Sequence, residues 1–334
     1  MDKLWSLDHV MKAGTQHPRL NNIDLDIRPG ITAIMGYSAA GKTSLLNLLA
    51  GFEQPDGGRI TFEAETGNAP LPLYWAPQNE GLWPHLNAAQ HLELVLPDSD
   101  ASSIDRLLAD FDILDRKDTT PDRLSQGERS RLAVARALAS GAPILIMDEP
   151  LVHVEIMRRR LYWQRIHDHV RERNVSLIFA SHQPAEVLGF AERVIFLKRG
   201  RVRYDGWTDL LYHQPPDEES AWCLGEINWF DEAEARNWLH RGSHDPHGYR
   251  PERLRIEEVE SGPIRVETAT FHGSLGEVWL RHETTGQARL FYHRPSSHQL
   301  RPGRPVRVEV LDAGADWTEE DVSTRDEREN RERG

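Results

Sequence analysis

One segment of the chain combines residue types and spacing that suit it to holding phosphate. Residues 36–44 read Gly-Tyr-Ser-Ala-Ala-Gly-Lys-Thr-Ser, a loop of the form G-x-x-x-x-G-K-[ST]. Gly36 and Gly41 permit backbone angles that a Cβ disfavours, and Lys42 places a charge on the β- and γ-phosphates. The Thr43 hydroxyl is the expected Mg²⁺ ligand. The predicted nucleotide-binding residues of this loop are Gly36, Tyr37, Ser38, Ala39, Ala40, Gly41, Lys42, Thr43 and Ser44.

The elements around this loop are those that a phosphate site needs. Residues 31–35 are a short apolar run rich in β-branched side chains, which predicts a buried strand. Residues 44–50 contain helix-forming leucines and are followed by Gly51, a helix-ending signal. A strand, a glycine loop and a helix together aim backbone N–H groups and a helix N-terminus at an anion. An ordinary glycine-rich turn is the alternative, and the motifs that follow disfavour it.

An acidic pair follows a second apolar strand about a hundred residues later. The strand is predicted at 144–147, and Asp148-Glu149-Pro150 comes directly after it. In nucleotide hydrolases a carboxylate at such a position helps to hold Mg²⁺, here Asp148, and its neighbour Glu149 would polarise the attacking water. Read alone, the pair is equally compatible with the acidic start of a helix, but the phosphate loop favours the catalytic interpretation.

A third motif makes the pattern specific. Leu124-Ser-Gln-Gly-Glu-Arg-Ser-Arg131 opens a predicted helix, and here the chain resembles the nucleotide-binding subunit of an ATP-binding-cassette (ABC) transporter, whose signature normally reads Leu-Ser-Gly-Gly-Gln. The resemblance implies two subunits paired head to tail, with Ser125, Gln126, Gly127 and Glu128 of one contacting the ATP held by the other. A helix N-terminus suits γ-phosphate recognition. The same residues also match a simple capping box, and both interpretations can hold together.

Three further segments match this family in order. The resemblance implies that Gln78 contacts Mg²⁺ and the attacking water, and that His182, in Ala180-Ser-His-Gln183, contacts the γ-phosphate region. It also implies that Trp83–Leu86 help to dock an integral membrane permease subunit. From the residues alone, a structural role for His182 and a core role for Trp83 and Leu86 stay open.

The resemblance also covers the C-terminal part of the chain. It implies an α/β P-loop NTPase over residues 1–213, with a RecA-like core, an antiparallel β subdomain and a helical subdomain at about 80–140. A connector is expected at 214–247. Short alternating strands at 264–271, 276–282, 288–293 and 306–311, separated by Gly and Pro, predict an all-β, OB-like domain at 248–312. Within the NTPase part, a strand is also predicted at 176–180 and a closing turn at 198–202. The charge-dense residues 313–334 are expected to form a disordered acidic tail.

The sequence departs from the family pattern at three places. Residues 11–17, where an aromatic side chain usually stacks on adenine, read Met-Lys-Ala-Gly-Thr-Gln-His, which leaves only His17 as a candidate ring. Ala39 replaces the usual third loop glycine. The segment after Glu149 normally reads Ser-Ala-Leu-Asp but here is Val152-His-Val-Glu155, which puts communication between two ATP sites in doubt. Every phosphate- and water-handling residue remains, so the sequence still predicts hydrolysis.

Composition narrows the class of protein. The chain has 334 residues, a net charge of −13, a single Cys223 and sixteen scattered His, which argues against a general nucleic-acid binder, an internal disulfide framework and a metal-binding motif. Residues 231–334 carry 16 Arg against 21 Asp plus Glu, so nucleic acid is not expected as a partner of the OB-like domain either. Neither a membrane span nor a signal peptide is visible in the sequence.

The sequence therefore predicts an ATPase, with ATP and Mg²⁺ as ligands, that powers an importer from the cytoplasmic face of the inner membrane. The expected partners are a second copy of the chain, permease subunits and, indirectly, a solute-binding protein. Two alternatives stay open. One is a soluble cassette ATPase acting on nucleic acid or ribosomes, and the other is a slow regulatory cassette with altered coupling. The transported solute is chosen by other chains.

Overall fold

The computed structural model describes residues 3–67, 69, 71–96, 101–239, 248–295 and 300–311. The chain forms two compact units, Met1–Tyr212 and His213–Gly334, and each is described by itself. The predicted acidic tail at 313–334 lies outside the described residues, as does part of the predicted connector. Within the described residues, none of the helices has both the length and the apolar character needed to cross a lipid bilayer.

A six-stranded sheet forms the centre of the first unit. Its strand order is β5-β6-β7-β3-β8-β9, and its neighbours pair in parallel except β8 and β9, which are antiparallel. The strands are β3 (Ile31–Met35), β5 (Tyr74–Ala76), β6 (Ile144–Asp148), β7 (Ser176–Ala180), β8 (Arg193–Lys198) and β9 (Arg201–Trp207). β3, β6 and β7 are buried along their whole length, which is why they read as continuous apolar runs rather than as alternating ones.

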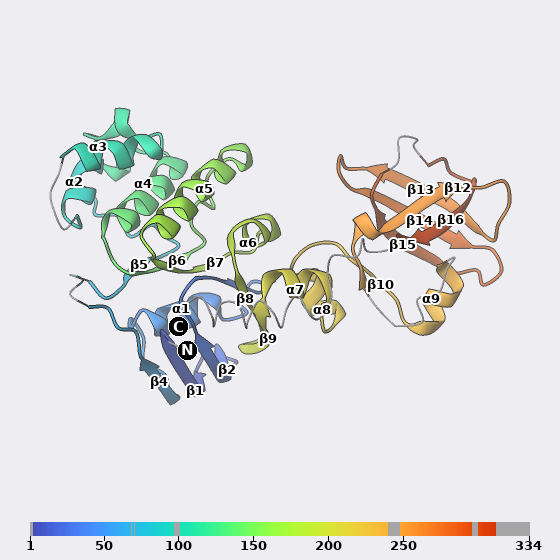
Figure 1. Cartoon of the computed structure of the whole chain (residues 1–334), viewed down its shortest axis with the longest axis horizontal. Coiled ribbons are helices and arrows are strands. Elements are labelled where there is room, and N and C mark those ends of the chain that lie inside the picture. Colours follow the sequence, from blue (N-terminus) through green and yellow to red (C-terminus); the bar gives the residue numbers. More distant parts are fainter. Residues whose placement is uncertain are drawn as a thin grey trace. The chain divides into compact units, whose positions relative to one another are not determined.

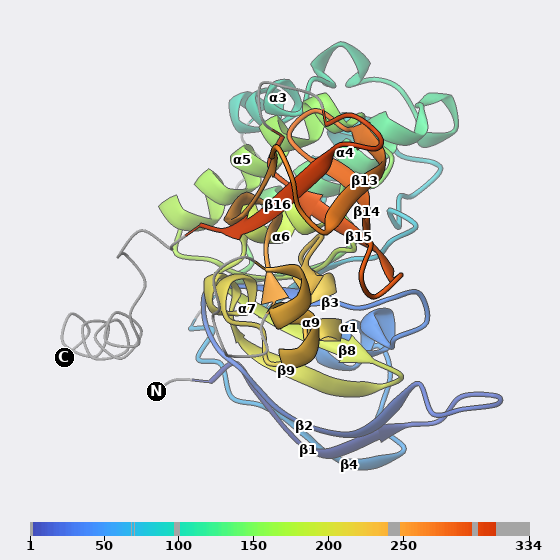
Figure 2. The ribbon, with the colours of Figure 1, turned by 90° about the vertical axis from the view of Figure 1, so that its right-hand side faces the viewer.

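A second, antiparallel sheet joins the first through helix α1 (Lys42–Leu49). Its order is β2-β1-β4, with β1 at Trp5–Lys12, β2 at Leu20–Ile27 and β4 at Gly57–Phe62. Leucines of α1 belong to one apolar core together with side chains of β1, β2, β3 and β6. Figures 1 and 2 show α1 lying between the two sheets. The helix that follows the phosphate loop is therefore fixed from both sides.

The other helices of this unit lie on and beyond the parallel sheet. Helices α2 (Ala88–Glu93), α3 (Ala101–Asp110) and α4 (Gln126–Ala139) gather away from β1, β2 and β4 (Figure 1). Two short 3₁₀ helices, η1 (Leu114–Arg116) and η2 (Pro121–Arg123), connect α3 to α4. Helices α5 (Ile156–Glu172) and α6 (Pro184–Phe190) follow β6 and β7, and α7 (Thr208–His213) follows β9. Helices α2, α3 and α4 fall within the range of about 80–140 in which a helical subdomain is expected.

The second unit is built on an antiparallel sheet of order β12-β16-β13-β14-β15. Phe230, Trp238 and Leu239, from the segment predicted as a connector, belong to its apolar core. The described part of that segment is therefore folded against the sheet. The elements are α8 (Glu218–Trp222), β10 (Asn228–Trp229), α9 (Glu232–Trp238), β11 (Gly248–Tyr249), η3 (Pro251–Arg253), β12 (Leu254–Glu258), β13 (Ile264–Phe271), β14 (Gly276–His282), β15 (Ala288–His293) and β16 (Pro305–Val310).

Most predicted elements lie within a few residues of their observed bounds. The predicted strands at 31–35, 176–180, 264–271, 276–282 and 288–293 coincide with β3, β7, β13, β14 and β15. The sequence did not predict several short elements, namely α6, α7, α8, α9, β9, β10, β11, β12 and the three 3₁₀ helices. Strand β9 occupies residues for which the sequence suggested only a closing turn at 198–202, and its side chains are half-buried or exposed, so it lacks the apolar run that identifies the central strands.

Candidate functional site

The phosphate loop lies between the end of β3 and the start of α1, as predicted. Gly41 is the N-cap of α1 and has a φ of +108°, in the region that side chains disfavour. A Cβ at Gly36 would lie 2.5 Å from the Leu197 carbonyl oxygen, and one at Gly41 would lie 2.5 Å from that of Arg19. Both glycines are therefore required by space and also by conformation, since φ at Gly36 is +156°.

Lys42 is buried inside this loop, with 9% of its surface exposed. Its Nζ donates to the carbonyl oxygen of Gly36 at 2.8 Å and to that of Tyr37 at 3.4 Å. The ammonium group is thereby held against the loop backbone at the N-terminus of α1, where the helix dipole also favours an anion. Ala39 has a φ of +62°, so its backbone is in the left-handed region. The replacement of the usual glycine is therefore a strained one.

The structure brings together the two predicted Mg²⁺ ligands Thr43 and Asp148, although 105 residues separate them. The Thr43 hydroxyl donates to Asp148 Oδ2 at 2.6 Å. Burial raises the pKa of the Asp148 carboxyl group, and the charge of Glu149 raises it further, while the hydrogen bond from Thr43 and the charge of Lys42 lower it. A buried carboxylate beside a hydroxyl oxygen is the kind of oxygen donor set that Mg²⁺ prefers, so these residues fit the expected ion.

Glu149 lies at the meeting point of two further predicted residues. Its Oε2 accepts a hydrogen bond from Gln78 Nε2 at 3.1 Å, and its Oε1 lies 3.2 Å from His182 Nδ1. Its backbone N–H donates to the Ala180 carbonyl at the end of β7, with a φ of +49° at Glu149. Side chains that follow β5, β6 and β7 thus converge at the carboxyl edge of the sheet, where ligands of such folds bind.

A cavity of about 420 Å³ lies beside these residues. Its walls include Thr43 and Asp148, which carry the oxygen donors, together with Gln78. His153, from the segment that departs from the family pattern, also lines it. The full lining consists of Thr43, Asn47, Trp75, Pro77, Gln78, Asn79, Asp148 and His153.

The signature residues start α4 and are absent from this cavity lining. Ser125 is the N-cap of α4: its hydroxyl accepts from Glu128 N at 3.2 Å, and its own N–H donates to Glu128 Oε2 at 2.7 Å. The capping box therefore forms, and the Ser125 N–H lowers the pKa of the Glu128 carboxyl group. A Cβ on Gly127 would lie 3.2 Å from the His153 carbonyl oxygen. The start of α4 thus lies directly against the 152–155 segment.

Two residues that sequence reasoning did not identify hold the loop around Trp83. Arg136 on α4 is buried, donates to the carbonyl oxygens of Glu80 and Gly81 at 2.8 Å, and places its guanidinium 4.7 Å from the centre of the Trp83 ring. His91 Nε2 accepts from the Trp83 backbone N–H at 2.9 Å. Trp83 and Leu86 are half-buried, whereas Pro84 and His85 are exposed. An arginine within a helix pattern offers no sequence signal for such a role.

Arg159 on α5 links the 152–155 segment to the region of His182. It donates to the carbonyl oxygens of Val152 and Val154, at 3.2 and 2.9 Å, and lies 3.4 Å from Glu186 Oε1. Glu186 in turn accepts from the hydroxyl of Ser181, the residue before His182. Burial raises the pKa of the Glu186 carboxyl group. A part-buried polar network therefore joins the altered segment to Ser181, the residue before His182.

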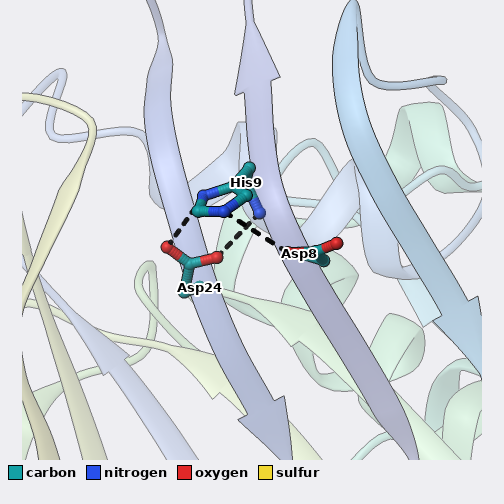
Figure 3. Close-up of side chains that lie close together, drawn as sticks. All are labelled: Asp8, His9 and Asp24. Carbon is teal, nitrogen blue, oxygen red and sulfur yellow. Dashed lines mark hydrogen bonds and ion pairs between the residues drawn. The ribbon is translucent and has the colours of Figure 1, made fainter.

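One group of possible metal-binding side chains lies away from this site. Asp8 and His9 on β1 and Asp24 on β2 lie together on the exposed face of the antiparallel sheet (Figure 3). The His9 N–H donates to Asp24 Oδ1 at 2.7 Å, and His9 Nδ1 lies 3.4 Å from Asp24 Oδ2. These contacts account for the cluster as exposed polar groups that meet across the two strands.

The family model described as "ABC transporter" matches residues 20–152. The chain is 30% identical over 320 residues to the "Fe(3+) ions import ATP-binding protein FbpC" of Serratia marcescens, covering 87% of this chain and 92% of that protein. This chain belongs to the ABC transporter family. It is therefore a transport-coupled ATPase of the ABC type.

Other similarities agree with this ABC assignment. The chain is 31% identical over 239 residues to the "Spermidine/putrescine import ATP-binding protein PotA" of Protochlamydia amoebophila, covering 67% of this chain and 63% of that protein. A solved dimeric ATP-binding cassette in a post-hydrolysis state, bound to ADP and Pi, superposes with a TM-score of 0.54 at 24% identity, covering 61% of this chain and 98% of the other. That structure supports the cassette fold predicted from the sequence.

Proposed function

We propose that this ABC subunit hydrolyses ATP at the site around Lys42, Asp148 and Glu149 to drive the import of a solute. The observation that carries the proposal is the placement of the Glu149 carboxylate between Gln78 and His182, next to the Thr43–Asp148 pair. A carboxylate within hydrogen-bond reach of two polar partners, directly after β6 at the same edge of the sheet as the phosphate loop, is positioned to orient a water molecule for attack on a γ-phosphate.

The positions of the site residues give each of them a distinct proposed role. The loop backbone, Lys42 and Ser44 would bind the phosphates, and the helix N-terminus adds favourable electrostatics. Thr43, Asp148 and Gln78 would hold Mg²⁺, which when bound neutralises charge on the β- and γ-phosphates. Glu149 would accept the proton of the attacking water, and His182, on the other side of Glu149, would contact the γ-phosphate region.

A second copy of the chain would complete each site. The exposed start of α4, with Ser125–Glu128, lies outside the cavity described above, so it is available to a nucleotide held by a partner. We place the subunit at the cytoplasmic face of the inner membrane, peripheral to permease subunits that contact the segment Trp83–Leu86. A solute-binding protein would act indirectly. The relatives named for import of Fe³⁺ and of spermidine/putrescine support import as the direction, and the solute itself is selected by the other subunits.

The test is the steady-state ATPase rate of the purified chain with Mg²⁺. Glu149→Gln should lower kcat by about a hundredfold or more, because general-base catalysis contributes on the order of 10²–10⁴, while ATP binding persists. Glu63→Gln, an exposed carboxylate after β4, is the matched control and should retain the wild-type rate. Equal, background-level rates for wild type and Glu149→Gln would instead favour the slow regulatory cassette that the altered 152–155 segment suggests.

A further inference from the structure

One side of the phosphate loop faces Glu149 and the other side faces away from it. Under the proposed function, the γ-phosphate of ATP lies on the first side and the nucleoside on the second. Gln78, Glu149 and His182 mark the γ-phosphate end. The α-phosphate, and with it the nucleoside, must leave the loop on the side away from Glu149. The inference below rests on the proposed function in this respect only, because it needs a nucleoside triphosphate in the loop.

The turn between β1 and β2 flanks that opposite side. The carbonyl oxygen of Arg19 lies 2.5 Å from where a Cβ of Gly41 would stand and 2.8 Å from where one of Gly200 would stand. Gly200 N donates to the Ala40 carbonyl at 3.0 Å, and Asn21 N donates to the Gly200 carbonyl at 2.7 Å. The backbone at Arg19 is therefore packed against the last residues of the phosphate loop.

Hydrogen bonds and an ion pair fix the guanidinium group of Arg19 at this position. Its guanidinium forms a two-pronged ion pair with the carboxylate of Glu53, and its Nε donates to the Ala13 carbonyl at 3.1 Å. Glu53 is itself fixed by Asn47 of α1, whose Nδ2 donates to Oε1 at 3.1 Å. All these bonds lie in the plane of the guanidinium, and the side chain is 40% exposed. A planar group is thus held by its edges, while part of the side chain stays exposed to solvent.

His17 carries the one aromatic ring in this turn, and its side chain is not held as that of Arg19 is. His17 is exposed, and within the described part of the chain its imidazole makes no hydrogen bond or ion pair. Residues 12–19 contain no Phe, Tyr or Trp. A base stacking on His17 would have to immobilise a free side chain, whereas Arg19 is already fixed by Glu53, Ala13 and, through Glu53, by α1.

We propose that Arg19 is the platform on which the adenine base of ATP stacks, in place of an aromatic side chain. A guanidinium stacks on aromatic faces through dispersion and cation–π attraction, and every base presents such a face. The ion pair with Glu53 also raises the pKa of Arg19, which agrees with a permanently charged platform. Glu53 and Ala13 are then positioning groups, and Arg19 is a binding residue for the base.

The test compares a ligand that has a base with one that does not. Dissociation constants of the full-length chain are measured by calorimetry for MgATP and for Mg-tripolyphosphate, which offers the phosphates alone. Arg19→Ala should weaken ATP binding about tenfold, within the range of base stacking, and should leave tripolyphosphate binding unchanged. Arg19→Tyr should restore ATP binding, and Glu53→Gln should weaken ATP binding by a smaller factor. His17→Ala should leave the dissociation constants of both ligands unchanged.

Two results would overturn the proposal. Equal weakening of ATP and tripolyphosphate by Arg19→Ala would mean that Arg19 supports the loop rather than the base, and unchanged ATP binding would mean that it does neither. Lys42→Ala separates this test from that of the proposed function, because it should abolish binding of both ligands. If the wild-type chain bound neither ligand, the proposed ATP site would fail independently of Arg19.

Discussion

Ala39 and Glu149 hold left-handed backbone conformations, with φ of +62° and +49°. A non-glycine residue in this region costs on the order of 1 kcal/mol or more. Both residues lie at the candidate site, one in the phosphate loop and the other between Gln78 and His182. The conformation of Glu149 is fixed by its N–H bond to Ala180 on the neighbouring strand, so the strain is maintained by the sheet and aims the carboxylate at its partners.

Relief of this strain can be measured at Ala39. Ala39→Gly should raise the free energy of unfolding by up to about 1 kcal/mol, because glycine adopts a φ near +60° without cost and loses only part of that gain through its more flexible unfolded state. Urea denaturation of the nucleotide-free chain checks it. Ala40→Gly is the matched control: Ala40 is buried and its φ is not positive, so it should destabilise. A loss of stability in both variants would contradict the strain at Ala39.

The residue types of the site were predictable, but their supporting contacts were not. Lys42 could be predicted because the phosphate-loop pattern contains it, and Asp148 and Glu149 because they directly follow an apolar strand. Arg136 acts through part-buried contacts to carbonyl oxygens on a segment 55 residues earlier in the sequence, and Arg159 joins nearby carbonyl oxygens to Glu186, which lies 27 residues later. Such contacts depend on which helices pack together, and a single sequence does not display that.

At the scale of elements, α2 and α4 together fix the loop that carries the proposed permease contact. His91 on α2 is fully buried, and its Nδ1 donates to the Asn87 carbonyl while its Nε2 accepts from Trp83 N–H. Both bonds are possible only for neutral imidazole. Burial lowers the pKa of His91, and the charge of Arg136 lowers it further. The loop is therefore anchored by a histidine that the fold keeps unprotonated.

This anchor predicts a pH dependence of stability. The pKa of His91 is lower in the folded chain than its ordinary value of 6.5, so its contribution is complete above pH 6.5 and is lost as pH falls toward the lowered value. At pH 7.5, His91→Leu should lower the free energy of unfolding by about 1–3 kcal/mol, because the Trp83 N–H loses its acceptor. At pH 5.5 the gap in free energy of unfolding between this variant and the wild type should be smaller. His91→Gln, which offers an acceptor, should cost less, and a gap that stays constant or widens in acid would refute this reading of His91.

Elements with continuous apolar runs were the most predictable. Strands β3, β6 and β7 are fully buried, and their sequences contain almost nothing else. The short helix α6 and the half-exposed strand β9 were missed because seven residues, or an alternating exposed pattern, give weak periodicity. The folded state of residues 228–239 was also missed, since two short elements joined by polar residues resemble a linker until the core that covers them is known.

At the scale of the whole molecule, two exposed apolar side chains, Ile156 and Met157, would lie near the surface where two copies meet in the proposed dimer. Gly127 packs against the backbone of His153, so the 152–155 segment is continuous with the signature surface. Directly after it, at the start of α5, Ile156 is 79% and Met157 90% exposed. In a symmetric pair the same patch faces its equivalent or the partner's phosphate loop. Exposed apolar side chains beside a proposed interface are typical of contact residues.

Ile156 and Met157 would then compensate for the unusual residues at 152–155 by adding apolar contact between the two copies. The prediction is tested in the Glu149→Gln background, in which ATP binding without hydrolysis should hold the dimer long enough for size-exclusion chromatography with light scattering. Met157→Glu should weaken ATP-dependent dimerisation by about tenfold or more, since it removes apolar area and, in a symmetric pair, introduces two like charges.

Phe52→Glu is the control for this experiment, because Phe52 is also highly exposed, at 71%, but follows α1 rather than the 152–155 segment. It should leave the dimer intact. If Met157→Glu dimerised as tightly as its parent, α5 would lie outside the interface, and the altered 152–155 segment would have to be explained within a single subunit, through the network of Arg159 and Glu186. If both variants failed to dimerise, the effect would be one of general surface charge rather than of the α5 contact.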